Sequence, residues 1–366
     1  MALGSTPATP AVIEATARTI ASLASSPPAE RAAVKSLRPL LGAAWARLPG
    51  GGARDTMTAL RTGVAREEMR LRTMGPIVER ALAALAAAGQ PFLLLRGLGL
   101  AATVYPEPVS RHCHDLDILV GPGHLEAALS ALEEAGFLPA EPDPSRHHQG
   151  QRRVHASGLP VEVHETLFPE RYYAAPVGEW FARSRPARVF GCEVAIPAPE
   201  HQLVQVLGLA SCTPQRHALR WVTDAWFLAS QTAGFDWDLF LRTALASRLP
   251  VPLDIQLHWL AEELALPVPT EVLARLRAEA ERSPPVARDV ALFGLRAGAL
   301  PGEPRLGPAT SLRDRLTLLR WMVLPSRAYL AHAHGVPARA TLPLYVRRML
   351  RALRGAVTPS PEPRRT

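Results

Sequence analysis

The chain has 366 residues, which is enough to bury a substantial core and to form two or three domains. No stretch approaches the roughly 20 apolar residues of a membrane span, and the first residues lack a basic segment followed by an apolar one, so we expect a cytoplasmic protein. The three cysteines, Cys113, Cys192 and Cys212, have neither zinc-site nor disulfide spacing, and the formal charge of +8, almost all from arginine, favours anionic partners only weakly.

Helices are predicted throughout the first 74 residues. They are expected at 11–23, at 30–48 and from Asp55 to Thr73, with the glycines at 50–52 as a break. We expect residues 1–74 to be a helical N-terminal extension, whose role the sequence does not indicate.

Residues 75–198 alternate between helical and strand patterns. Pro76 and Gly89 stand where the two ends of a helix are expected. The apolar run Phe92–Leu95 predicts a short buried strand, and Arg96-Gly97 predicts a tight turn into a short helix.

The next predicted strand contains Asp115 and Asp117. Alternate side chains of a strand face the same way, so both carboxylates project together while Leu116 and Ile118 belong to a packing face. Two adjacent anions need protons or cations to neutralise them, and hard oxygen ligands suit Mg²⁺ or Mn²⁺.

Two further strands, at 151–156 and 159–167, are predicted to form a hairpin through Ser157-Gly158. In the second strand Glu162 and His164 alternate with valines and share one face. If this strand lies beside the Asp-x-Asp strand, the carboxylates of Asp115, Asp117 and Glu162 form a cluster that resembles a two-metal site in outline.

Mostly helical patterns follow Pro199, predicting a helical C-terminal domain at 199–356 and a disordered, Pro-rich tail at 357–366. The last predicted helix, 342–354, carries four arginines. They could hold RNA, but they lack interleaved aromatic residues, and a solvated basic face is the simpler interpretation.

Each candidate residue also has a structural interpretation. Asp115 and Asp117 could be exposed carboxylates on an edge strand, and His164 could contact a nucleotide or satisfy a backbone group. Arg96 and Arg111 could bind phosphates or form ion pairs. Three more groups are expected to have structural roles. The histidines are interpreted as solvated loop residues and not as zinc ligands: His112, His114, His147 and His148. Arg216, Arg220 and Asp224 are interpreted as an ion-pair ladder on one helix, with substrate contact as the alternative, and Trp221, Trp226 and Trp259 as aromatic residues that pack between helices.

Four motifs carry a resemblance to a known family. They are, in chain order, Phe92-Leu93-Leu94-Leu95-Arg96-Gly97, Arg111-x-x-x-Asp115-x-Asp117-Ile118-Leu119-Val120, Val161-Glu162-Val163-His164 and Leu219-Arg220-Trp221-Val222-x-Asp224. Together they resemble the bacterial uncharacterised nucleotidyltransferase family of the DNA polymerase beta-like superfamily, over roughly Gly75 to Leu353.

The resemblance implies an α+β fold with a small mixed nucleotidyltransferase palm sheet at 75–198, flanked by helices. It also implies a metal-dependent enzyme that uses a nucleoside triphosphate such as ATP, with Asp115, Asp117 and Glu162 as catalytic and metal-binding carboxylates. Members usually have Lys-Gly where this chain has Arg96-Gly97, and the Gly-Ser turn of better-known relatives is absent. A planar guanidinium and a point charge bind phosphate differently, so the geometry of triphosphate binding can differ.

The leading hypothesis is a Mg²⁺- or Mn²⁺-dependent nucleotidyltransferase in which Arg96, Gly97, Arg111 and His164 contact the nucleotide. Members of the family occur beside genes for modified peptides, so a peptide or protein is a candidate acceptor besides a small molecule. An inactive nucleotide-binding scaffold and an RNA-modifying transferase are the alternatives.

Overall fold

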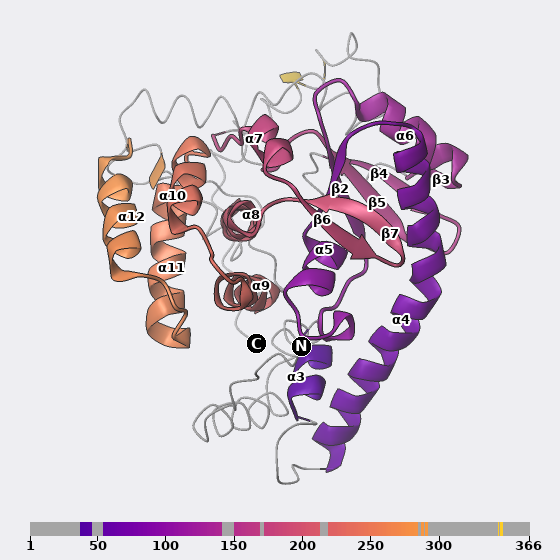
Figure 1. The fold of residues 1–366 in the computed structure, drawn as a ribbon, viewed down its shortest axis with the longest axis horizontal. Coiled ribbons are helices and arrows are strands. Elements are labelled where there is room, and N and C mark those ends of the chain that lie inside the picture. Colours follow the sequence, from indigo (N-terminus) through magenta and orange to yellow (C-terminus); the bar gives the residue numbers. More distant parts are fainter. Residues whose placement is uncertain are drawn as a thin grey trace.

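The computed structural model describes residues 37–45, 54–140, 150–168, 172–212, 219–284, 287–288, 290–291, 343 and 345–346. Within these residues a five-stranded mixed sheet has helices on both faces, which confirms the predicted α+β class and mixed palm sheet (Figure 1). The elements up to the end of this sheet are α3 (Arg38–Trp45), α4 (Arg54–Ala87), β1 (Phe92–Leu95), α5 (Arg96–Thr103), the 3-10 turn η1 (Pro108–Ser110), β2 (Leu116–Val120), α6 (Leu125–Glu134), β3 (Phe137–Pro139), β4 (Gly150–His155) and β5 (Pro160–His164). The later elements are α7 (Val177–Ala182), β6 (Arg185–Val189), β7 (Cys192–Ile196), α8 (Pro199–Cys212), α9 (Leu219–Gln231), α10 (Trp237–Ala246), α11 (Pro250–Leu264) and α12 (Thr270–Arg282).

The strand order of the sheet is β1-β2-β5-β4-β3. Its centre is the parallel pair β2 and β5, in which Asp117 lies beside Glu162 and Leu119 beside His164. β1 is antiparallel to β2, and β4 is antiparallel to β5. The two strands predicted to carry the acidic residues are therefore direct neighbours.

Strand alternation gives this sheet two different faces. Ile118 and Val163 point to a fully buried apolar layer that also contains Leu82 of α4 and Leu129 of α6. Figure 1 shows α4 and α6 together on this side of the sheet. The alanines and leucines of α6 recur at helical spacing, so they form one apolar face that packs on the sheet. Gly136 follows the helix with φ +90°, the left-handed conformation that commonly ends a helix.

The opposite face looks toward the C-terminal helices. Leu93 and Leu119 of this face belong to a second core with residues of α8 to α12, such as Leu207 and Leu257. Asp117, Glu162 and His164 extend from the same face, because they alternate with the residues of the first apolar layer. The polar residues therefore lie on the side of the sheet that the helical region flanks.

The structure corrects the predicted helix boundary at Pro76. α4 runs from Arg54 to Ala87 without a break at Pro76, so the two helices predicted on either side of this proline are one helix of 34 residues. A proline inside a helix removes one backbone hydrogen bond and usually costs about 3 kcal/mol. Here Met74 and Val78 are buried on either side of the exposed Pro76, and this packing holds the helix together.

The predicted hairpin of β4 and β5 is confirmed, but its turn is longer than expected. Three residues form the loop, because the His155 N–H donates to the Leu159 carbonyl (2.9 Å) and the Gly158 N–H donates to the His155 carbonyl (2.8 Å). Gly158 takes φ +86°, which suits the last position of a three-residue hairpin loop. This register pairs Arg152 with Glu162.

Helices predicted after Pro199 are confirmed as α8 to α12, and Asp236 caps α10 by accepting the Leu239 N–H (2.8 Å). The sequence did not predict α7, β3 or the β6–β7 hairpin. Within the part of the chain that the structure describes, no helix has the length and apolar character needed to cross a membrane. The helix predicted at 11–23 and the tail predicted at 357–366 lie outside the described residues, as does most of the helix predicted at 342–354.

Candidate functional site

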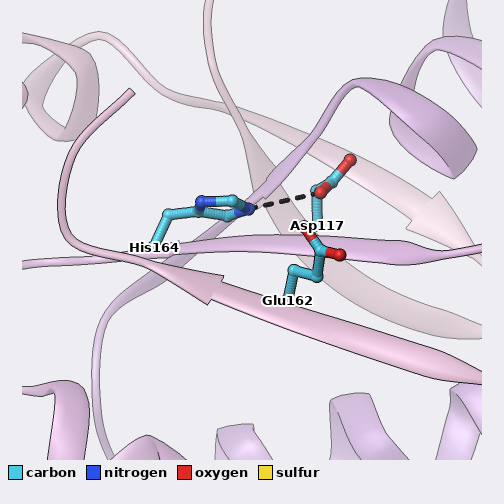
Figure 2. Close-up of side chains that lie close together, drawn as sticks. All are labelled: Asp117, Glu162 and His164. Carbon is cyan, nitrogen blue, oxygen red and sulfur yellow. Dashed lines mark hydrogen bonds and ion pairs between the residues drawn. The ribbon is translucent and has the colours of Figure 1, made fainter. Parts of the chain in front are cut away.

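Asp117, Glu162 and His164 form a compact polar group on one face of the β2–β5 pair. Each of them offers a ligand atom, and these atoms all lie within 4.8 Å of one another. Figure 2 shows the three side chains pointing toward a common point above the two strands. Among the residues with a described placement, this is the cluster of three His, Cys, Asp or Glu side chains that could hold a metal ion.

Backbone geometry explains why the three side chains meet. The parallel register sets Asp117 beside Glu162, and His164 follows Glu162 by two residues on the same face. Gly150 of β4 pairs with His164, and a Cβ atom at Gly150 would lie 2.8 Å from the imidazole. The absence of a side chain at Gly150 therefore leaves space for the His164 ring, whose Nε2 lies 3.3 Å from Asp117 Oδ1.

Asp117 is a buried carboxylate that remains charged. Burial alone would raise its pKa, but the guanidinium of Arg96, with Nη2 2.9 Å from Oδ2, and the imidazole of His164 together hold this pKa well below its usual range. Its side chain is only 7% exposed. Asp117 is therefore a buried anion whose two oxygens each have a partner, Arg96 for Oδ2 and His164 for Oδ1.

Glu162 has the opposite electrostatic character. Burial is the largest cause that raises its pKa, and the negative charges of Asp117 and Asp115 raise it further, whereas His164 and Arg152 lower it. A carboxylate with a raised pKa is better suited than an ordinary one to accept a proton near neutral pH. The two acidic groups of the pair thus differ in proton affinity because their neighbours differ.

Asp115 lies just before β2 and outside the group of three. Its side chain is 28% exposed, and Oδ2 is 3.3 Å from Nε2 of His114. Burial lowers the pKa of His114, although the nearby charge of Asp115 opposes this effect. Asp115 is therefore more accessible to solvent than Asp117.

The predicted turn at Arg96-Gly97 has an unusual backbone. Arg96 has φ +37° and Gly97 has φ +21° with ψ −111°, both outside the helical region although they start α5. A positive φ is costly for a residue with a Cβ atom. This backbone conformation at Arg96 sets the direction in which its side chain leaves the turn. The guanidinium then reaches Asp117 and remains 30% exposed.

Arg111, predicted to contact a nucleotide, lies in a buried ion pair. Its Nε and Nη2 atoms donate to the two carboxylate oxygens of Asp224 on α9, at 2.8 and 2.7 Å, and both side chains are 5% exposed. Burial would lower the pKa of Arg111, but Asp224 raises it well above the usual value. This pairing favours a structural role for Arg111.

The predicted ladder of Arg216, Arg220 and Asp224 is rearranged accordingly. Asp224 pairs with Arg111, while Arg220 Nη1 donates to the His112 carbonyl at 3.3 Å. Arg216 lies outside the described residues.

The donor set fits a divalent cation. Two carboxylates and one imidazole are ligands for Mg²⁺ or Mn²⁺, and Asp115 can add another carboxylate. The arrangement lacks a cysteine ligand, and Cys113 faces the core, fully buried. These residues are therefore compatible with the predicted Mg²⁺ or Mn²⁺ site.

Two neighbours of the site escaped the sequence analysis. Arg152 lies directly opposite Glu162, and its Nε is buried without a hydrogen-bond partner in the described structure. Gly150 was not recognised as the residue that makes room for His164. The correct number of residues in the hairpin loop would have identified both neighbours, because the loop length sets the register and hence which residues of β4 lie opposite Glu162 and His164.

Comparison with known proteins identifies the family. The family model described as uncharacterised nucleotidyltransferase matches residues 29–265, about two thirds of the chain. The expected span from Gly75 to Leu353 is therefore wrong at both ends, since the match includes α3 and α4 and stops after α11. No curated protein and no solved structure matches the chain. Since the family model covers more than half of the chain and contains all residues of the site, the chain belongs to this nucleotidyltransferase family and is a transferase enzyme.

Proposed function

We propose that the protein is a divalent-metal-dependent nucleotidyltransferase, which moves a nucleoside monophosphate from a nucleoside triphosphate to a hydroxyl, phosphate or protein side chain. The observation that carries this proposal is the group of Asp117, Glu162 and His164, with ligand atoms within 4.8 Å of one another. Membership in the nucleotidyltransferase family supports the reaction class.

Asp115, Asp117 and Glu162 are the proposed metal ligands, with His164 as a further ligand or a contact to the nucleotide. When bound, Mg²⁺ or Mn²⁺ would supply positive charge to the phosphates and to the attacking oxygen. The low pKa of Asp117 keeps its carboxylate ionised and ready to bind a cation over the whole physiological pH range.

Glu162 is the proposed general base. The acceptor oxygen forms a bond to the α-phosphorus, the bond from this phosphorus to the pyrophosphate oxygen breaks, and the acceptor proton passes to the Glu162 carboxylate. A carboxylate oxygen placed beside the attacking oxygen is suited to accept this proton. Arg152, its direct neighbour on β4, is suited to stabilise the carboxylate before the transfer.

Arg96 and Gly97 are proposed to bind the triphosphate. The Arg96 guanidinium is partly exposed beside Asp117, and a planar guanidinium binds two phosphate oxygens at once. Release of Arg96 from Asp117 would make this cation available to the leaving pyrophosphate. Arg111 is left out of this group because its donors are directed to Asp224 and Cys113.

The direct test measures pyrophosphate release and labelled product from each α-labelled nucleoside triphosphate, with Mg²⁺ or Mn²⁺ and with candidate small-molecule, peptide and RNA acceptors. Wild-type protein should require the metal, and Asp117→Asn and Glu162→Gln should lose activity. Glu165→Gln, which changes a nearby carboxylate on the loop after β5, is the matched control. Undiminished activity after Asp115→Ala plus Asp117→Ala would refute the proposal.

The ion pair of Arg96 with Asp117 (2.9 Å) favours a second candidate, an inactive nucleotide-binding scaffold in which an internal cation takes the place of metal. Such a protein would bind a nucleoside triphosphate without metal and release no pyrophosphate. Calorimetry with and without Mg²⁺ distinguishes the two candidates. Nucleotide affinity that rises with Mg²⁺ in wild type, but not in Asp117→Asn, supports the enzyme.

A further inference from the structure

Glu67 is a buried acidic residue with several polar partners. It lies on α4, outside the sheet, and only 2% of it is exposed. One oxygen, Oε1, accepts the backbone N–H of Cys113 at 3.0 Å, and the other, Oε2, lies 2.7 Å from Nδ1 of His112. Arg70, one helical turn later, places Nη1 3.4 Å from Oε2. A buried carboxylate is expensive unless it is hydrogen-bonded, so an apolar residue would have served simple packing better.

These contacts hold the segment that leads into the metal-binding strand. The rings of His112 and His114 stack, with centroids 5.5 Å apart and planes inclined by 17°, and His114 Nε2 lies 3.3 Å from Asp115 Oδ2. Glu67 therefore acts on Asp115 by two routes. One route is the backbone at Cys113, two residues before Asp115, and the other is the pair of stacked imidazoles.

The same segment is also bound by α9, a helix that follows the sheet in the chain. Asp224 of α9 binds Arg111, and Arg220 of α9 donates to the His112 carbonyl at 3.3 Å. The segment Arg111–Asp115 thus lies between a helix that precedes the sheet and a helix that follows it. The family model spans both helices, which agrees with a site built from parts outside the palm sheet.

We propose that Glu67 is a positioning residue of the transferase site, which fixes the segment Arg111–Asp115 so that Asp115 and Asp117 hold their cation in the reactive arrangement. This inference rests on the proposed function. Glu67 does not belong to the ligand group of Asp117, Glu162 and His164, so it acts through the loop and not on the substrate. A small displacement of catalytic groups is enough to slow a reaction greatly.

The test compares Glu67→Ala, Glu67→Gln and the matched control Glu68→Ala, which removes an exposed carboxylate from the adjacent position of α4. Three quantities are measured: Mn²⁺ affinity by electron paramagnetic resonance, kcat and KM for pyrophosphate release, and Tm. Glu67→Ala should lower Mn²⁺ affinity or kcat by about 10–100-fold with little change in KM for the nucleotide, as found for residues that orient metal ligands. Glu67→Gln should restore most of the loss, because its amide oxygen still accepts the Cys113 N–H.

Wild-type Mn²⁺ affinity and kcat in a folded Glu67→Ala protein would overturn the proposal. Equal impairment in Glu67→Gln would also overturn it, since the charge and not the positioning would then matter. If Glu67→Ala does not fold, Glu67→Met decides the question: it fills a similar volume but accepts neither the Cys113 N–H nor the His112 contact, and wild-type Mn²⁺ affinity and kcat in this variant contradict the proposal.

Asp117→Asn, measured in the same assays, separates this inference from the proposed function. If Asp117→Asn retains Mn²⁺ binding and pyrophosphate release, the metal-dependent function itself is wrong. If Asp117→Asn loses both while Glu67→Ala behaves as wild type, only the role of Glu67 is wrong.

Discussion

The two faces of the β2–β5 pair have opposite physical characters although they come from the same ten residues. On one face Ile118 and Val163 are fully buried against α4 and α6. On the other face Asp117 and Glu162 lie side by side, where their charges repel. The comparison teaches that the apolar face fixes the strand register, and this register holds together two acidic groups that would separate in a free chain.

The side of the sheet that carries the acidic residues also tolerates buried polar groups farther from the site. The first turn of α8 buries Glu200, His201 and Gln202, and the His201 ring stacks on Trp180 with centroids 4.9 Å apart. The side covered by α4 and α6 is largely an aliphatic layer. Substitutions on the two sides should therefore affect different quantities: stability on the aliphatic side, and activity or pH dependence on the other.

The largest effect is expected for Asp117→Asn on the polar face. Loss of the charge that holds the cation should cost several kcal/mol of transition-state stabilisation, which is about a thousandfold in kcat/KM. Loss of the ion pair with Arg96 should also lower the free energy of unfolding, but by less, because the Arg96 guanidinium is partly exposed and can be hydrated. Pyrophosphate release and urea unfolding, measured on the same preparation, test this contrast, and equal losses in both would contradict it.

Ile118→Ala tests the aliphatic face. Truncation of this fully buried side chain leaves a cavity and should lower the free energy of unfolding by about 2–5 kcal/mol. The remaining folded protein should keep its nucleotide affinity, because no ligand is altered. Leu138→Ala, at a side chain that is 62% exposed on β3, is the control and should leave urea unfolding nearly unchanged.

His201 predicts an acid-sensitive component of stability. Burial, with a smaller effect of Arg183, lowers its pKa from 6.5 to about 4. The unfolded chain therefore takes up a proton below pH 6.5 that the native ring does not, so stability is full above this pH and falls as the pH decreases toward 4. The loss amounts to about 3 kcal/mol at most.

His201→Phe should keep the stacking on Trp180 and remove this component. Urea unfolding at several pH values between 7 and 4 gives the free energy of unfolding as a function of pH. The contribution of His201 is the difference between the slopes of these two curves, for wild type and for the variant. Parallel pH profiles would show that His201 does not titrate in this manner.

The smallest effect is expected for Gly150→Ala. The new methyl group would lie 2.8 Å from the His164 ring and push it away from Asp117, while the other contacts of the site remain. We expect a loss of about tenfold in kcat/KM, of the size seen when a partner of a metal ligand is removed. Gly158→Asn, at the left-handed position of the hairpin turn, is a control for the strand pair and should leave activity close to wild type.

Local patterns were sufficient to predict that Asp117 and Glu162 lie together, but not that His164 takes the third place in the group while Asp115 lies outside it. Alternation of apolar and polar residues identified the faces of β2 and β5, and the side chains of Asp117, Glu162 and His164 meet on one face of the sheet as this pattern suggested. The helices after Pro199 followed from spacing in the same way. The catalytic roles of these residues, like the division into domains and the location in the cytoplasm, remain predictions.

Features that depend on distant parts of the chain could not be predicted. The partner of Arg111 is Asp224, on a helix more than 100 residues away, and no local pattern pairs the two. Pro76 signals a helix end locally, but tertiary packing of the neighbouring residues overrides that signal. The β6–β7 hairpin was missed because exposed arginines and a proline interrupt the alternation in β6.

The ion pair of Arg96 with Asp117 has a consequence for how the protein matures. Many small metal-binding domains stay unfolded until their ion arrives, because the free energy of metal binding is what drives their folding. Here the chain carries its own counter-charge at 2.9 Å from the buried carboxylate. The folded sheet therefore does not need a bound ion to balance the charge of Asp117, and a cation that binds there would compete with one arginine side chain.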